Sequence, residues 1–383
     1  MATPSVLNLQ KMLEPIAGDS MVGPDLRLDI SPGSIYQQIR DAREQSRNVE
    51  REIQKGNPDY SPDQLVWNKV QELSTKALTE KSKDFGITAW LCEALVRLKG
   101  FGGLRDGLKF ARKLADDYWS GLYPQPEEEE GVEPPSDLEK VITRVKPFEG
   151  LFAGALAFPI NNIVITESEP YSFADYRAAQ ALDKESDKAV RQAKLDAGVV
   201  QMGEFNAAHA ATTPEFYKNL HEDLMQCLAE LQNLSKSLDN KCGKDEKGFP
   251  VSPPVSDTEK LLGECLEIVV NLGKSKGLFA AEAAGGTDVA TTGEAGAAQG
   301  QPAANGRGSI VTRDDALAAL SHIAEFFRRV EPHSPIAHHV EEAVRWGRMD
   351  LATLLSELIG DDKMRQAVFT RIGIMDVAEA KKK

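Results

Sequence analysis

Three histidines near the carboxyl end of the chain come closest to the residue types and spacing of a metal or acid/base site. They are His333, His338 and His339, with Glu341 and Glu342 close behind them. Zinc ligands on a helix must share one face, and His338 and Glu342, four residues apart, meet this requirement. His338 and His339, however, diverge by about 100° around a helix, so the two cannot easily reach one ion together with His333. The pattern therefore favours surface histidines, and we expect no metal site.

Other reactive patterns are weaker. Gly18-Asp19-Ser20 invites comparison with a hydrolase nucleophile, but no strand-like segment precedes it and no G-x-S-x-G surrounds it. The sequence contains no Walker loop, dinucleotide-binding glycine fingerprint or H-E-x-x-H helix, and the glycine-rich stretch 285–308 lacks the lysine of a phosphate loop. We therefore predict that the chain is not an enzyme and has no catalytic residues, no cofactor and no metal. An all-helical enzyme with a histidine or carboxylate site is the alternative.

The composition bounds the class of protein. The chain has 383 residues, 41% hydrophobic and 27% charged, enough for roughly two or three domains. Its net charge of -14 argues against a nucleic-acid binder and against attraction to anionic lipid. No basic leader with an apolar core begins the sequence, and no apolar stretch is long enough to span a bilayer. We therefore expect a cytoplasmic protein without membrane insertion.

The cysteine spacing also indicates a reducing compartment. Cys92, Cys227, Cys242 and Cys265 lie far apart and form no C-x-x-C pair. Cys92 and Cys227 fall within apolar helical patterns. All four are expected to be buried, free thiols in a reducing compartment.

The stretch 82–124 predicts a helical hairpin, which is the clearest structural element in the sequence. Apolar residues recur there at three- and four-residue steps in two runs, separated by Gly100, Gly102 and Gly103. Glycines permit the tight reversal that two such helices need. Ser82 is expected to cap the first helix, and Pro124 ends the second. The charged residues of the hairpin are expected to face outward.

The same stretch carries a resemblance to a known family. The runs SKD, AWLCEALVRLKGFGGLRDGL and YWSGLYP resemble the signature of the ImpA-type N-terminal region of TssA proteins, which are components of bacterial type VI secretion systems. Typical members have Leu-Arg where this chain has Phe85 and Gly86. The segment 23–29 and the pattern Tyr171, Ser172, Asp175 and Tyr176 are similar to further motifs of that region. Ser172 and Asp175, three residues apart, also predict a capping box at the start of a helix. The resemblance covers roughly the first 180 residues.

The rest of the chain predicts an all-α fold. Helices are expected over 35–55, from Pro62 to 78, over 138–156, over 178–238 with a break near 212–214, and over 258–278. The segment 160–166 is the best candidate for extended backbone, and 127–133 is expected to be an exposed acidic loop.

We predict four parts: an ImpA-type N-terminal helical domain (1–180), a middle helical region (181–279), a flexible Ala/Gly linker (280–309) and a C-terminal helical bundle (310–383). The run FFRRVEPHSPIAHHVEEAVRWGRMDLATLLSELI resembles the C-terminal region of short TssA-type proteins, and it implies an oligomerisation bundle. The apolar residues expected to mediate self-association are Phe326, Phe327, Ile336, Val340, Val344, Trp346, Leu351, Leu354, Leu355, Leu358 and Phe369.

The resemblance implies a structural function. Proteins of this family act at the baseplate and in building or capping the contractile tail of tube and sheath. The expected partners are further copies of the chain, in a ring-shaped homo-oligomer, and the baseplate, tail tube and sheath proteins of a type VI secretion system. No nucleic acid and no cofactor are expected. A generic helical adaptor protein is a further alternative.

Overall fold

The structure is a computed structural model of the chain, and it describes nearly all of the first 279 residues and parts of the remainder. The described residues are 2–127, 131, 133–279, 317, 318, 320, 321, 323–325, 328, 335–349, 351–359, 361 and 365. The chain divides into two compact units, Met1–Val289 and Ala290–Lys383.

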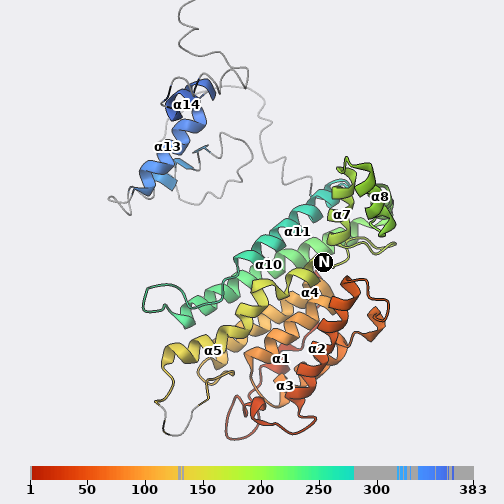
Figure 1. Ribbon diagram of the computed structural model, residues 1–383. Coiled ribbons are helices and arrows are strands. Elements are labelled where there is room, and N and C mark those ends of the chain that lie inside the picture. Colours follow the sequence, from red (N-terminus) through yellow and green to blue (C-terminus); the bar gives the residue numbers. More distant parts are fainter. Residues whose placement is uncertain are drawn as a thin grey trace, which may run out of the picture. The chain divides into compact units, whose positions relative to one another are not determined.

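The centre of the first unit is the helical hairpin that the sequence predicted, element α4 (Phe85–Tyr118). The backbone of Gly100 has a φ of 57° and a ψ of -143°, which interrupts the helix and reverses the chain. Glycine adopts this φ without strain because it has no Cβ. Figure 1 shows α4 in the middle of the unit, between α3 and α10. The predicted reversal at the glycines is confirmed.

Small residues bring the two arms of the hairpin into close contact. A Cβ added at Gly103 would lie 2.4 Å from the carbonyl oxygen of Leu95 on the opposite arm. A Cβ added at Gly107 would lie 2.8 Å from the Sγ atom of Cys92. The backbones can approach this closely only because these positions carry no side chain.

The hairpin begins two residues later than a cap at Ser82 would require. The N-cap is Asp84, whose carboxylate accepts a hydrogen bond from the Ile87 N–H at 2.9 Å. The Ser82 hydroxyl instead donates to the Pro24 carbonyl at 2.8 Å. The predicted cap at Ser82 is therefore wrong, because that side chain holds the preceding loop.

Helices cover the hairpin on two sides. On one side α3 (Trp67–Glu80) packs against α4, and α2 (Ile35–Gln54) packs against α3. On the other side α10 (Pro214–Cys242) packs against α4, and α11 (Ser256–Lys274) packs against α10. One continuous apolar core joins these elements, so the middle helical region predicted from the sequence lies against the N-terminal one.

The other elements of this unit surround that core. They are α1 (Leu9–Met12), η1 (Leu26–Leu28), η2 (Pro62–Gln64), α5 (Asp137–Gly150), η3 (Leu151–Ala155), α6 (Ala157–Asn161), α7 (Phe173–Asp183), α8 (Lys188–Asp196) and α9 (Met202–Ala211). The capping box predicted at Ser172 is confirmed: its hydroxyl accepts from the Asp175 N–H, and the Asp175 carboxylate accepts from the Ser172 N–H.

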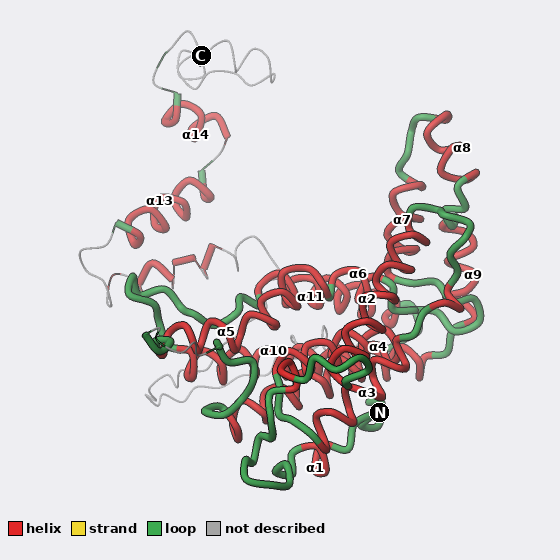
Figure 2. Tube along the Cα trace, turned by 60° about the horizontal axis from the view of Figure 1, so that its bottom comes forward, coloured by secondary structure: helices red, strands yellow, loops and turns green. Residues whose placement is uncertain are grey.

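Two expectations for the segment after α5 need correction. Residues 160 and 161 complete α6, and only Val164 is extended enough to form an isolated bridge, with Ser172. The segment 178–238 is broken before Pro214 as predicted, but it also breaks at 184–187 and at 197–201, where Gly198 has a φ of 80°. The described residues contain helices and isolated bridges but no strand (Figure 2), which confirms the all-α class.

The prediction that the charged residues of the hairpin face outward holds for Asp116 and Asp117, which are exposed, but it is wrong for Asp84 and Glu93, which are buried. Each of these two carboxylates is paired with arginine from another element. Arg27 donates to both oxygens of Asp84, at 2.6 and 3.1 Å. Arg43 and Arg47 of α2 donate to the two oxygens of Glu93, at 2.7 and 2.6 Å. Buried carboxylates of this kind require such compensation.

A second buried network fastens the first residues of the chain, which we call the N-terminal strap (residues 2–7), across α4 and α10. The Val6 N–H donates to the carboxylate of Asp106 at 2.6 Å. The Thr3 N–H donates to Asp223 of α10 at 2.8 Å. Arg105 lies between the two carboxylates and donates to both, at 2.8 and 3.1 Å. The strap therefore links two elements that are far apart in sequence.

Lys83 is also fully buried. Its ammonium group donates to the backbone carbonyls of Met12 and Leu78, at 2.7 and 2.9 Å. Burial lowers the pKa of Lys83 to about 8, partly offset by the negative charge of Glu14.

The four cysteines match their prediction. Cys92, Cys227, Cys242 and Cys265 are all buried and free. Burial raises the pKa of Cys92, Cys242 and Cys265 to about 12, so these thiols are protonated at neutral pH.

In the second unit the structure describes two longer helices, α13 (Ile336–Arg348) and α14 (Leu351–Leu358). The predicted linker 280–309 and most of the acidic loop 127–133 lie outside the described residues. The proposed boundaries of the C-terminal bundle (310–383) stay predictions. Among the helices that are described, none is long and apolar enough to cross a membrane.

Candidate partner-binding groove

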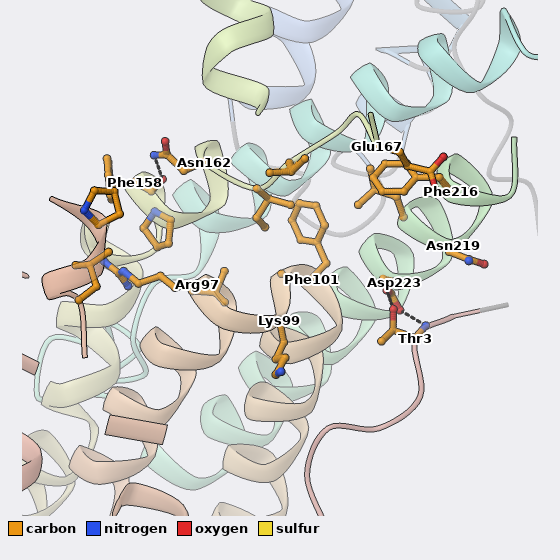
Figure 3. Close-up of a pocket in the computed structure, with 18 of the residues that line it drawn as sticks. Thr3, Arg97, Lys99, Phe101, Phe158, Asn162, Glu167, Phe216, Asn219 and Asp223 are labelled. Atoms are coloured by element: carbon orange, nitrogen blue, oxygen red, sulfur yellow. Dashed lines mark hydrogen bonds between the residues drawn. The ribbon is translucent and has the colours of Figure 1, made fainter. Parts of the chain in front are cut away.

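An open groove of about 720 Å³ lies at the turn of the hairpin (Figure 3). Residues of α2, α4, α6 and α10 line it, together with the segment 162–167. The hairpin turns back at Gly100, and Figure 3 shows α6 and the first turns of α10 on opposite sides of that turn. The groove is the space between them.

Aromatic side chains give the groove its apolar walls. Phe158 of α6 stands on one side and is 38% exposed, and Phe216 of α10 stands on the other (Figure 3). Phe101 lies between them and is almost fully buried, with its ring packed edge-on against Phe173 at a centroid distance of 5.9 Å. An apolar surface held open by rigid aromatic rings is typical of a binding groove.

Near Phe158, the groove meets a fixed ion pair. Arg97 donates from Nε and Nη2 to the two oxygens of Glu50, at 2.7 and 2.9 Å. The guanidinium also lies over the ring of Trp67, with its central carbon 4.1 Å from the ring centroid. A bidentate pair stacked on an aromatic ring has little freedom to rearrange.

The carboxylates on the opposite side are engaged in holding the fold. Asp223 accepts hydrogen bonds from the strap residue Thr3 and from Arg105. Glu167 accepts from the Thr213 N–H at 2.7 Å, just before α10 begins. Neither carboxylate is placed to transfer a proton to a ligand without losing a structural contact. Both carboxylates therefore serve as structural acceptors at the edge of the groove.

One histidine outside the predicted cluster makes contacts that resemble a catalytic arrangement. His209 of α9 lies 2.8 Å from the Tyr217 hydroxyl through Nδ1 and 2.7 Å from the Ser275 hydroxyl through Nε2. Ser275 also donates to the Leu272 carbonyl at 2.7 Å, and in the tautomer that satisfies both contacts Nε2 carries a proton and donates to the Ser275 oxygen. In that tautomer His209 is not a base toward Ser275. Burial and the nearby Lys276 lower the pKa of His209, which favours the neutral ring.

The histidine cluster predicted near the carboxyl end is only partly described. His338 and His339 are exposed on α13, and His333 lies outside the described residues. Within the described part of the chain, no group of three or more His, Cys, Asp or Glu residues is arranged to hold a metal ion.

The residues predicted for self-association also lie in this unit. Phe326, Phe327 and Phe369 are outside the described residues, and Ile336 is described only as part of α13. Val344 is buried, whereas Leu351 and Leu358 are each 53% exposed. The remaining predicted residues, Val340, Trp346, Leu354 and Leu355, are half-buried. Their role in self-association stays a prediction.

Fold and groove together define the class: an all-α protein built on a central helical hairpin, with an open apolar groove at the turn of the hairpin. Comparison with known proteins specifies it further. Residues 13–153 match the family model described as ImpA, N-terminal, type VI secretion system. The chain is also 25% identical to the type VI secretion system component TssA1 of Pseudomonas aeruginosa, over 93% of this chain and 96% of that protein.

A solved structure shares the fold. It is the N-terminal domain, including the conserved ImpA_N region, of the TssA component of the type VI secretion system from Burkholderia cenocepacia. The match has a TM-score of 0.54 and 19% sequence identity, and it covers 70% of this chain and 95% of that one. The family model and the similarity to TssA1 indicate a TssA component of a type VI secretion system, and they confirm the resemblance seen in the sequence motifs.

Proposed function

We propose that this TssA component acts at the baseplate of the secretion machine and in the assembly or capping of its contractile tail of tube and sheath. Its N-terminal unit binds partner proteins, and its C-terminal unit joins copies of the chain into a ring. The protein works in the cytoplasm, and its role is structural rather than catalytic.

The observation that carries this proposal is the open aromatic groove in the unit that contains the ImpA-type region. Exposed aromatic side chains such as Phe158 contribute much of the binding energy in protein interfaces. The charged groups beside the groove are tied up in structural contacts, as described for Asp223 and Glu167. A groove of this kind supports binding to another protein.

The ring assignment rests on the apolar residues of the C-terminal unit. Leu351 and Leu358 expose half of their surface on α14, where an oligomer would cover them. A ring multiplies weak contacts, because many N-terminal units are then held near one growing tail.

The test is a mass measurement of the full chain in solution by light scattering. We expect an oligomer, and we expect a chain that lacks residues 310–383 to be smaller in subunit number while its first unit keeps its helical content. An oligomer of unchanged size after this deletion would refute the ring assignment. Purification together with the tail tube, sheath and baseplate proteins of the same bacterium tests the partner assignment.

A further inference from the structure

A second cleft adjoins the groove and has the opposite chemistry. It holds about 500 Å³ and lies between α2 and the turn from η3 to α6. Gly154, Ala155 and Phe158 form one wall. Arginines form the other, and they are Arg40, Arg43, Arg47 and Arg51 from α2 and Arg97 from α4.

The arginines of α2 face the cleft because of their spacing. Arg40, Arg43, Arg47 and Arg51 follow one another at steps of three, four and four residues, which places them on one face of a helix. The adjacent face of α2 carries the buried residues of the helix, including Ile39 and Val49. The register that buries α2 therefore presents a row of positive charge.

This row has more positive than negative charge. Within the cleft, the carboxylates are Glu44 and Glu50, with Glu93 buried beneath, against five arginines. Glu93 and Glu50 engage Arg43, Arg47 and Arg97. Burial lowers the pKa of the half-buried Arg43, and the charges of Arg47 and Arg97 lower it further, against the opposing effect of Glu93.

Two arginines at the ends of the row are available to a partner. Arg40 is exposed, and its closest carboxylate is that of its sequence neighbour Asp41, at 3.5 Å. Arg51 is exposed, and its nearest contact is the side-chain amide of Asn48, also at 3.5 Å. Among the described residues, Arg51 has no carboxylate within 4.0 Å. A local positive surplus is unusual on a chain whose net charge is -14.

The cleft is continuous with the aromatic groove, since Glu50, Gln54, Arg97 and Phe158 line both. Figure 3 shows Arg97 and Phe158 together at this junction. An occupant that covers both parts must therefore offer apolar groups to the aromatic half and negative charge to the arginine half. A small anion would satisfy only the second half, and a purely apolar helix only the first.

We propose that the joined groove and cleft bind a linear segment of another secretion protein, in which apolar residues adjoin a run of carboxylates. This inference rests on the proposed partner-binding function and specifies the partner's chemistry. The carboxylates meet Arg40 and Arg51 and steer the encounter, while the apolar side chains cover Phe158 and Phe216.

The test uses short overlapping peptides that tile the tail tube, sheath and baseplate proteins of the same bacterium, probed with the full chain. We expect the bound peptides to combine apolar residues with neighbouring carboxylates. The best of these is then measured by fluorescence anisotropy at low and high salt. We expect the affinity to fall as salt rises, because the arginines are exposed.

Three variants examine the two halves. The double variant Arg40→Glu with Arg51→Glu should lower the affinity for the peptide at least about tenfold at low salt, since each change replaces an attraction by a repulsion. Phe158→Ala should lower this affinity about fivefold or more. The matched control reverses two exposed lysines elsewhere, Lys236→Glu with Lys260→Glu, and should change the affinity less than about twofold. Unchanged melting temperatures show that all three variants fold.

The outcomes separate this inference from the proposed function. If whole partner proteins copurify but no peptide binds, or if bound peptides lack carboxylates, the groove proposal is wrong and the partner-binding function stands. If Arg40→Glu with Arg51→Glu lowers the affinity for the peptide and Phe158→Ala does not, the cleft binds an anion and the proposal is also wrong. If the variants change the oligomer mass, the occupant is a second copy of this chain. If no whole protein copurifies, the proposed function itself fails.

Discussion

Asp84 supports two structures at once, and a pair of substitutions separates them. Its carboxylate caps the first arm of the hairpin through the Ile87 N–H, and it receives two hydrogen bonds from Arg27. Asp84→Asn keeps an oxygen acceptor for the cap and removes the charge. Asp84→Ala removes both. The carboxylate side chain is fully buried, whereas that of Arg27 is 26% exposed.

The magnitudes follow from these contacts. Removing one partner of a buried ion pair costs about 3–5 kcal/mol, and Arg27 can turn partly toward water, so we expect about 3 kcal/mol for Asp84→Asn. Loss of a helix cap costs about 1 kcal/mol more, so Asp84→Ala should cost about 4 kcal/mol. Arg27→Met in the Asp84→Asn background should recover part of the loss, because no uncompensated charge then stays buried.

The assay is urea unfolding of the full chain followed by tryptophan fluorescence, since Trp119 packs edge-on against Phe85 at a centroid distance of 6.4 Å. The matched control is Asp29→Asn, an exposed carboxylate in the adjoining loop, which should change the free energy of unfolding by less than about 0.5 kcal/mol. If Asp84→Asn costs no more than Asp29→Asn, the buried pair does not stabilise the fold and the reasoning is wrong.

Three further predictions concern other parts of the chain. Gly103→Ala places a Cβ 2.4 Å from a carbonyl oxygen of the opposite arm and should destabilise the fold by about 2–4 kcal/mol. Gly263→Ala in α11 meets nothing within 4 Å and should stabilise the fold by about 0.5–1 kcal/mol. Equal urea midpoints for the two variants would contradict this prediction. The pKa of Lys83 is lowered to about 8, so above that pH the unfolded chain binds more protons than the folded chain. The free energy of unfolding should therefore rise by about 1–3 kcal/mol from pH 8 to 10. In urea titrations, Lys83→Met should abolish this rise. Leu351→Ser with Leu358→Ser should reduce the oligomer mass measured by light scattering without changing the helical content, and an unchanged mass would count against α14 as an interface.

The hairpin could be predicted from the sequence because its signals are local. Apolar residues at helical spacing and the glycines at its turn lie within one stretch of the chain, and Gly100 has the φ that the turn requires. The same local reasoning placed the capping box at Ser172 correctly. It failed at Ser82, because the loop that this hydroxyl holds comes from Pro24, 58 residues away.

The buried charges could not be predicted because their partners are distant in sequence. Arg27 is 57 residues from Asp84, and Arg105 is 118 residues from Asp223. From composition alone a charged residue is expected to be exposed, and only the packed structure brings its partner into place. The groove escaped prediction for the same reason, since Phe158 and Phe216 come from separate elements.

The N-terminal strap has a practical consequence for anyone who handles this protein. Thr3 and Val6 supply donors to Asp223 and Asp106, so trimming the first residues would leave two carboxylates without these hydrogen bonds beneath the surface. A purification handle or fluorescent reporter fused directly at this end would crowd the same anchoring point. Reporter fusions should therefore keep residues 2–7 intact and reach them through a spacer.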